Sequence, residues 1–265
     1  MKIRMGELTA AETRRIFLVR PIILLPLGSH EDQGPHAPMG DYLSAERMAE
    51  LIAERATEQG TRTLVAPVLP FGGADFFGTT PGGIALSQST LSAVLDDIFS
   101  SLLRHGQTRL IVINGHGGNM QAIHFSTQAI WRTEKILIPS FYLWKIAKTL
   151  LPGIVGADIA ARSTGHGADP LTSVATHLFP ALMRPDLIPS LHDAPDIMGM
   201  KVSNFGSASF EGVDIEVPLE LSHITPDGVF GADPRLCSAE TGAKLVTALA
   251  DLGARFVRHY AAQTG

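Results

Sequence analysis

Short aliphatic runs alternate along this chain with stretches whose apolar residues recur at helical spacing. Continuous aliphatic runs are typical of buried parallel strands, and a 3.6-residue period is typical of helices packed on one face. We expect strands over residues 22–25, 63–69, 110–113 and 135–141. We expect helices over 10–15, 42–59, 120–132, 171–178 and 238–260, another that begins at Ser87 or Ser89, and either a short helix or a pocket wall over 142–151.

This alternation predicts repeated βαβ units, whose parallel strands are joined by right-handed crossovers. We therefore expect an α/β fold: a single-domain, three-layer αβα arrangement with a mostly parallel sheet over residues 1–265. Residues 180–235 break the pattern because they are rich in Pro, Asp and Gly. Short strands or arms are expected there at 202–210 and 213–217, where such excursions often build contacts between subunits.

Composition narrows the classes of function. The 265 residues are 45% hydrophobic and carry a net charge of −5, without a basic run or face, so nucleic acid is not an expected partner. No segment is apolar and long enough to predict a membrane span. The single cysteine, Cys237, excludes an internal disulfide framework and any site with several cysteines. We expect a cytoplasmic protein that acts on a small molecule.

Side chains that can bind a metal gather in three loops. Glu31 and Asp41 follow the first strand, His116 follows the strand 110–113, and a third loop carries His166 and Asp169. Because parallel strands present their carboxyl ends at one edge of a sheet, these loops can converge. Each residue also has a simpler explanation, since Asp41 and Asp169 can be helix N-caps and His116 can be a turn histidine.

Together the three loops favour hydrolysis assisted by a divalent metal, because carboxylate and imidazole ligands suit Zn, Mn or Fe. In this hypothesis His166 moves a proton and Asp169 completes the metal shell. The glycines beside His116 leave room for a ligand, so Gly117 is expected to contact substrate. The Gly- and Phe-rich stretch 70–87 is expected to be a substrate loop, with Asp75 and Phe76 as binding residues.

Five motifs, in order along the chain, resemble those of the creatininase (creatinine amidohydrolase) family. They are E-x-x-G-P-H-x-P from Glu31 with Asp41 after it, P-G-G-I-A-L-S from Pro81, N-G-H-G-G-N from Asn114, H-G-A-D-x-x-T-S from His166, and P-D-G-V-F-G-A-D-P from Pro226. The resemblance implies a single α/β domain, hydrolysis of cyclic amides or formamides, and one or two divalent ions. It places metal ligands at Glu31, Asp41 and His116 and proton transfer at His166. It also implies a homo-oligomer, with the hexamer as a common form.

This chain departs from the family motifs at several positions. Gln33 stands where the family has a histidine ligand of a second metal, Asp169 replaces a glutamate, and Leu171 replaces another glutamate. An amide oxygen is a poorer transition-metal ligand than imidazole, so one ion is a safer expectation than two, with Gln33 as a weak candidate ligand. Asp75 weakly suggests a cationic or hydroxyl-rich substrate. Two alternatives stay open: hydrolysis or isomerisation of a cyclic polyol ketone, and a metal-poor homologue without catalytic activity.

Overall fold

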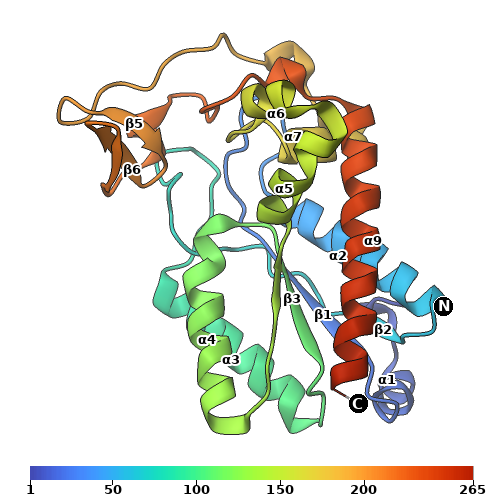
Figure 1. The fold of residues 1–265 in the computed structure, drawn as a ribbon. Coiled ribbons are helices and arrows are strands. Elements are labelled where there is room, and N and C mark those ends of the chain that lie inside the picture. The colour runs from blue at the N-terminus through green and yellow to red at the C-terminus, as the bar shows by residue number, and fades with distance from the viewer. Residues whose placement is uncertain (265) are drawn as a thin grey trace.

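A parallel four-stranded sheet lies at the centre of the molecule (Figure 1). The structure, a computed structural model, describes the backbone of residues 1–264 and the side chains of these residues other than 221 and 222. The strands are β1 (Ile22–Leu27), β2 (Thr63–Val65), β3 (Leu110–Asn114) and β4 (Ser140–Tyr142), in the spatial order β2-β1-β3-β4. The expected α/β class with a parallel sheet is therefore confirmed.

Helices cover both faces of this sheet. One face carries α2 (Tyr42–Glu58), α5 (Leu143–Val155) and α9 (Ala239–Gln263), and the other carries α3 (Gln88–Arg104) and α4 (Met120–Glu134) (Figure 1). Alternate residues of β1 enter the two cores: Ile22 and Leu24 pack with the first set of helices, and Ile23 and Leu25 pack with the second. This period of two explains why β1 is apolar throughout.

Serine and threonine caps define the helix starts that the sequence predicts. Thr9 and Glu12 form a capping box at α1 (Ala10–Phe17), Ser87 caps α3, and Ser238 caps α9. Gly253 lets α9 approach α2, because a Cβ there would lie 2.6 Å from Ile52 Cδ1.

The remaining elements lie beyond the carboxyl edge of the sheet. They are α6 (Ala157–Ser163), α7 (Leu171–Leu178) and α8 (Leu221–Ile224), together with an antiparallel sheet of β5 (Lys201–Asn204), β6 (Ser207–Phe210) and β7 (Val213–Glu216). Short 3-10 turns cover Met5–Glu7, Gly117–Asn119, Pro180–Leu182, Pro185–Leu187 and Pro234–Leu236. The small sheet, called the arm below, projects to one side in Figure 1.

Two predicted strands are shorter than expected. The strand predicted over 63–69 ends at Val65, because Pro67 has no N–H for the ladder, although Leu69 still bridges Leu27. The strand predicted over 135–141 begins only at Ser140. Lys135 instead ends α4 in a left-handed conformation (φ 58°), and Pro139 again lacks a donor. No helix within the described part of the chain is long and apolar enough to cross a membrane.

Candidate metal centre and active-site cavity

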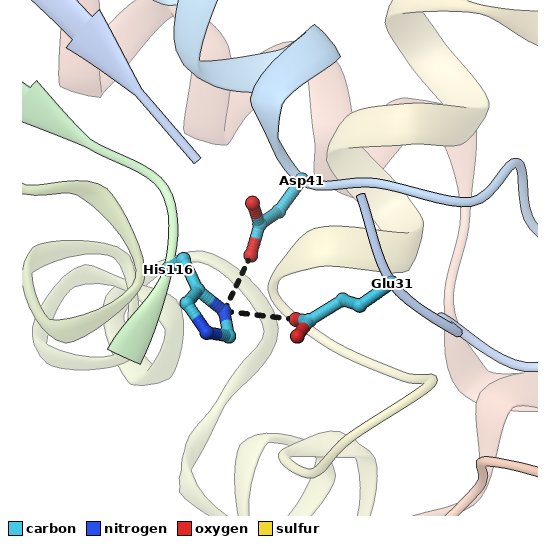
Figure 2. A group of neighbouring side chains, drawn as sticks. All are labelled: Glu31, Asp41 and His116. Atoms are coloured by element: carbon cyan, nitrogen blue, oxygen red, sulfur yellow. Dashed lines mark hydrogen bonds and ion pairs between the residues drawn. The ribbon is translucent and has the colours of Figure 1, made fainter. Parts of the chain in front are cut away.

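Three acidic and imidazole side chains meet at the carboxyl edge of the sheet (Figure 2). Glu31 comes from the loop after β1, Asp41 from the start of α2, and His116 from the turn after β3. His116 Nδ1 lies 2.9 Å from Glu31 Oε1 and 3.2 Å from Asp41 Oδ2. All three side chains are buried, and they form the one cluster among the described residues whose ligand atoms suit a metal ion.

Asp41 occupies the N-cap position of α2, but its side chain does not cap the helix. Its Oδ1 accepts a hydrogen bond from the Ser29 backbone N–H at 2.7 Å, which turns Oδ2 towards His116. The N-cap alternative for this carboxylate is therefore wrong. A helix start fixes its backbone, and the loop after β1 fixes its side chain.

The turn that carries His116 is held by its own asparagines. Asn114 accepts from the His116 backbone N–H at 3.1 Å and donates to the His116 carbonyl at 2.8 Å. Asn119 accepts from Gly73 N–H at 2.9 Å and donates to Gly28 O at 3.1 Å, so it fastens this turn to two neighbouring loops. These bonds give the asparagine at each end of the motif a structural role in this chain.

The imidazole orientation suits metal binding. His116 Nε2 lies 3.0 Å from Gly73 O, and because a carbonyl can only accept, Nε2 carries the hydrogen. In the neutral ring this leaves the Nδ1 lone pair facing both carboxylates. Metal-binding histidines usually donate their other ring N–H to a carbonyl or carboxylate in this way. The hydrogen bond between His116 Nε2 and Gly73 O leaves no room for a side chain at Gly118. A Cβ there would collide with Gly73 O and lie 2.5 Å from His116 Nε2.

The buried negative charges of Glu31 and Asp41 destabilise the folded protein when no cation is bound. Burial raises the pKa of Glu31 to about 7 and also raises the pKa of Asp41. Burial alone would lower the pKa of His116, but the two carboxylates raise it well above its usual value. The metal-free site thus holds protons that a divalent ion would replace.

The spacing of the ligand atoms also fits an ion. Tetrahedral metal–ligand bonds of about 2.0–2.1 Å place ligand atoms roughly 3.3 Å apart. The two measured separations, 2.9 and 3.2 Å, are close to this value. Glu31, Asp41 and His116 could therefore hold one divalent ion at the wall of the cavity.

Gln33 and Leu171 lie beside this cluster and line the same cavity. Gln33 Nε2 donates to Glu31 Oε1 at 2.9 Å, so in this structure the amide supports a metal ligand and does not act as one. Leu171 offers no ligand atom. The structure thus gives a second ion at most a weak set of ligands.

The metal cluster opens into a cavity of about 360 Å³. Five aromatic side chains in its walls come from the 70–87 loop, β4, α5 and the arm: Phe76, Phe77, Tyr142, Trp144 and Phe205. Gly117, Asn204 and Lys148 also face it. Burial raises the pKa of Tyr142, so its hydroxyl stays a hydrogen-bond donor.

His166 lies in the wall of this cavity. Its ring stacks on Phe77 at 4.7 Å and meets Phe205 edge-on at 5.0 Å. Its Nδ1 lies 2.6 Å from Gly228 O and therefore carries the hydrogen, while Nε2 has no hydrogen-bond partner among the described residues. Burial lowers the pKa of His166 to about 4, so the neutral ring presents a proton acceptor.

The structure does not bring two of the expected site residues to the cavity. Asp75 is exposed and is not among the lining residues, because the 70–87 loop turns Phe76 and Phe77 inward instead. Asp169 is wholly buried and also does not line the cavity. Its carboxylate lies near the Cys237 thiol, whose pKa is raised by burial and then by Asp169. We therefore omit Asp75 and Asp169 from the site that we propose.

Sequence reasoning did not single out Lys148, Asn204 or Phe205, which also line the cavity. Lys148 follows Trp144 by one helical turn, and that spacing could have revealed it once the helix was placed. Asn204 and Phe205 belong to the arm, and no local pattern indicates that the arm folds over the cavity.

Comparison with known proteins agrees with this architecture. The family model described as creatinine amidohydrolase matches residues 6–257. The chain is 25% identical over 258 residues to a mycofactocin precursor peptide peptidase of Mycobacterium ulcerans, covering 93% of this chain and 88% of that protein. It is 29% identical over 206 residues to a creatinine amidohydrolase of Pseudomonas putida, covering 69% of this chain and 74% of that protein.

Solved structures show the same fold. A solved structure named creatininase Mn superposes with a TM-score of 0.74 at 23% identity, covering 98% of each chain. The resemblance seen in the five motifs is thus confirmed over nearly the whole sequence. The chain belongs to the creatininase (creatinine amidohydrolase) family and is a hydrolase of that family.

Proposed function

We propose that this protein hydrolyses the C–N bond of a small amide or peptide with the help of one divalent ion held by Glu31, Asp41 and His116. The observation that carries the proposal is the convergence of these three buried ligands, with His116 Nδ1 facing both carboxylates at the wall of a cavity. The activities for which the relatives are named, those of a peptidase and a creatinine amidohydrolase, support cleavage of an amide bond.

One ion per chain is the number that these ligands support. A second ion would need donors where Gln33 and Leu171 stand, and neither provides a strong one. The donor set of two carboxylates and one imidazole suits Mn, Zn or Fe. One of the solved creatininase structures is named for Mn, which supports Mn as the first metal to try.

Such an ion, when bound, supplies water acidified to a pKa of about 7 and polarises the substrate carbonyl. The chain's own residues then handle the protons. His166 Nε2 is an unprotonated acceptor at neutral pH, and its Nδ1–H is fixed on Gly228 O. It can take a proton from the attacking water and pass it to the leaving nitrogen. The Tyr142 hydroxyl can donate to a substrate oxygen.

The cavity walls favour an amide over a cyclic polyol ketone. A polyol needs a hydrogen-bonding partner for most of its hydroxyl groups, because buried polar groups without partners are costly. The lining does include the aromatic side chains of Phe76, Phe77 and Phe205, and Asp75, the residue that suggested a hydroxyl-rich ligand, does not line it. The three converging ligands and the unpaired acceptor on His166 likewise favour an enzyme over a non-catalytic homologue.

The test is hydrolysis by protein reconstituted with Mn or Zn. Wild-type protein and the His116→Ala variant are incubated with four classes of compound: cyclic amides, dipeptides, acylated amino acids and cyclic polyol ketones. The products are identified by NMR. We expect amine and carboxylate to form from at least one amide with wild-type protein only. Turnover of polyol ketones without turnover of any amide would contradict the proposal.

We also propose that the chain forms a homo-oligomer, and the hexamer expected from the family is one candidate. The support is an exposed apolar strip on the arm, formed by Phe210, Val213 and Ile215. Light scattering of the purified protein tests this, and a monomer at micromolar concentration would contradict it. The cytoplasmic location stays a prediction.

A further inference from the structure

We propose that the substrate carries a carboxylate group and that Lys148, in the wall of the same cavity, binds it. The inference rests on the proposed function, because it names the class of amide that the site accepts. It makes Lys148 a specificity-determining residue.

The position of Lys148 is fixed by its helix. Trp144 Nε1 donates a hydrogen bond to Gly115 O, the residue before His116, which anchors the first turn of α5 against the metal cluster. Lys148 lies four residues later on the same face of α5, about one turn or roughly 5–6 Å along the axis. Both residues line the cavity, so Lys148 adds its charge to the wall that Trp144 anchors beside His116.

Lys148 is available to a ligand. Its residue is exposed, and it has no ion pair or side-chain hydrogen bond with any described part of the chain. Some surface lysines pair with acidic residues, as Lys244 does with Glu240 at 2.8 Å and Lys201 with Asp196 at 2.9 Å. Lys145 has no such partner among the described residues either, but of these lysines only Lys148 lines the cavity. A lysine that faces a cavity without a carboxylate partner is a ready binding group for an anion.

The charges around the cavity point in the same direction. The charge of a divalent ion would balance the carboxylates of Glu31 and Asp41. Lys148 is then left as the unbalanced charge among the described lining residues, because the remaining walls are aromatic, aliphatic or amide. A cavity whose unbalanced charge is positive and whose walls include several aromatic side chains favours an anionic substrate with an apolar body.

The resulting arrangement orders the substrate along the cavity. The scissile amide would lie at Glu31, Asp41 and His116, its apolar part against Phe76 and the other aromatic walls, and its carboxylate at Lys148. A peptide with a free C-terminus and a cyclic amide with a carboxylate both have this chemistry. Creatinine has no carboxylate and lacks the group that Lys148 would bind.

Two pairs of probes test the proposal and distinguish these two sources. N-acetylphenylalanine and N-acetylphenylalanine amide form the linear pair, and 5-oxoproline and its amide form the cyclic pair. Within each pair only the charge of one group changes. Binding to Mn-loaded protein is measured by calorimetry at low salt, and NMR of the same samples reports any hydrolysis. The variants are Lys148→Met and Lys148→Arg, with Lys145→Met as control, because Lys145 is exposed on the same helix but does not line the cavity.

We expect wild-type protein to prefer the carboxylate in one of the two pairs by about tenfold, which corresponds to one charge-assisted hydrogen bond. Lys148→Met should lose that preference, Lys148→Arg should keep most of it, and Lys145→Met should behave as wild type. Equal binding of acid and amide in both pairs, or no binding of either acid, would overturn the proposal. The same preference in Lys148→Met would also overturn it.

Failure of the proposed function gives a different result. If the carboxylate preference depends on Lys148 but no amide is hydrolysed under any condition, the subsite stands and the assignment as an active hydrolase fails. If amides are hydrolysed without any preference for carboxylates, hydrolysis stands and the carboxylate subsite is wrong.

Discussion

Replacement of Glu31 by glutamine should stabilise the metal-free protein while it weakens metal binding. Glu31 is buried, and burial raises its pKa from 4.5 to about 7. Glutamine has nearly the same shape and keeps an oxygen that can accept from Gln33, but it has no charge. Glu31→Gln should therefore not lower the free energy of unfolding of the metal-free protein.

The magnitude follows from the pKa shift. A shift of about 2.5 pH units corresponds to about 3 kcal/mol at 1.36 kcal/mol per unit. The folded state binds the extra proton between pH 4.5 and 7, so this penalty grows over that range and is complete above pH 7. The attraction to His116 is already included in this shift, because it is one of the effects that set the pKa of Glu31. We expect a net stabilisation of about 1–3 kcal/mol at pH 8, or about 2–6 °C in Tm for a chain of this length.

Thermal unfolding at pH 5 and pH 8, with EDTA or with added Mn or Zn, measures both effects. Wild-type protein should gain about 5 °C from metal at 100 times its Kd, and Glu31→Gln should gain almost nothing. In EDTA the variant should exceed wild type at pH 8 and match it more closely at pH 5. A variant that is less stable than wild type in EDTA at pH 8 and keeps the full metal shift would refute this reasoning.

Glu50 provides the matched control. It is as buried as Glu31, but its carboxylate pairs with Arg4 Nη2 at 2.6 Å and with Arg47 Nη1 at 2.9 Å. Glu50→Gln should lower stability by about 1–3 kcal/mol and leave the metal shift unchanged. If Glu31→Gln raises the stability of the metal-free protein and Glu50→Gln lowers it, Glu31 lacks a neighbouring cation that a bound metal would supply.

Three further predictions concern neighbouring residues. His166→Gln should lower turnover at least about 100-fold with unchanged metal content, because it removes the proton acceptor at Nε2; loss of metal from this variant would contradict its role. Gly118→Ala should weaken metal binding about 10–100-fold by displacing His116 Nε2 from Gly73 O, which a metal titration can measure; unchanged affinity would show that this contact is unimportant. Gln33→His should raise affinity for a second ion, and an unchanged stoichiometry would show that position 33 does not face a second site.

The sequence predicts those features that depend on local patterns. The aliphatic run at Leu110–Asn114 reveals a buried strand, and the strand-end rule then correctly brings His116 to the same edge as Glu31 and Asp41. The same rule misplaces Asp169, because the buried loop from Ser163 turns its carboxylate inside the protein, near Cys237.

Features that arise from tertiary packing are not visible in the sequence. Phe205 reaches the cavity only because the arm folds back over the 70–87 loop, where its ring lies 6.2 Å from Phe76 and 6.0 Å from Phe77. Nothing near residue 205 indicates that contact. The sequence around Lys148 likewise gives no sign that it lines the cavity. The hydrogen bond from Trp144 to Gly115 O determines which face of α5 packs against the site.

The metal content of the purified chain tests the central claim most directly. Protein prepared without chelator, and again after dialysis against Mn or Zn, is analysed for elements and for protein concentration, with His116→Ala as the control. We expect about one ion per wild-type chain and almost none in the variant. Wild-type protein that holds no ion even after dialysis against Mn or Zn, or a variant that holds as much as wild type, would contradict the metal centre at Glu31, Asp41 and His116.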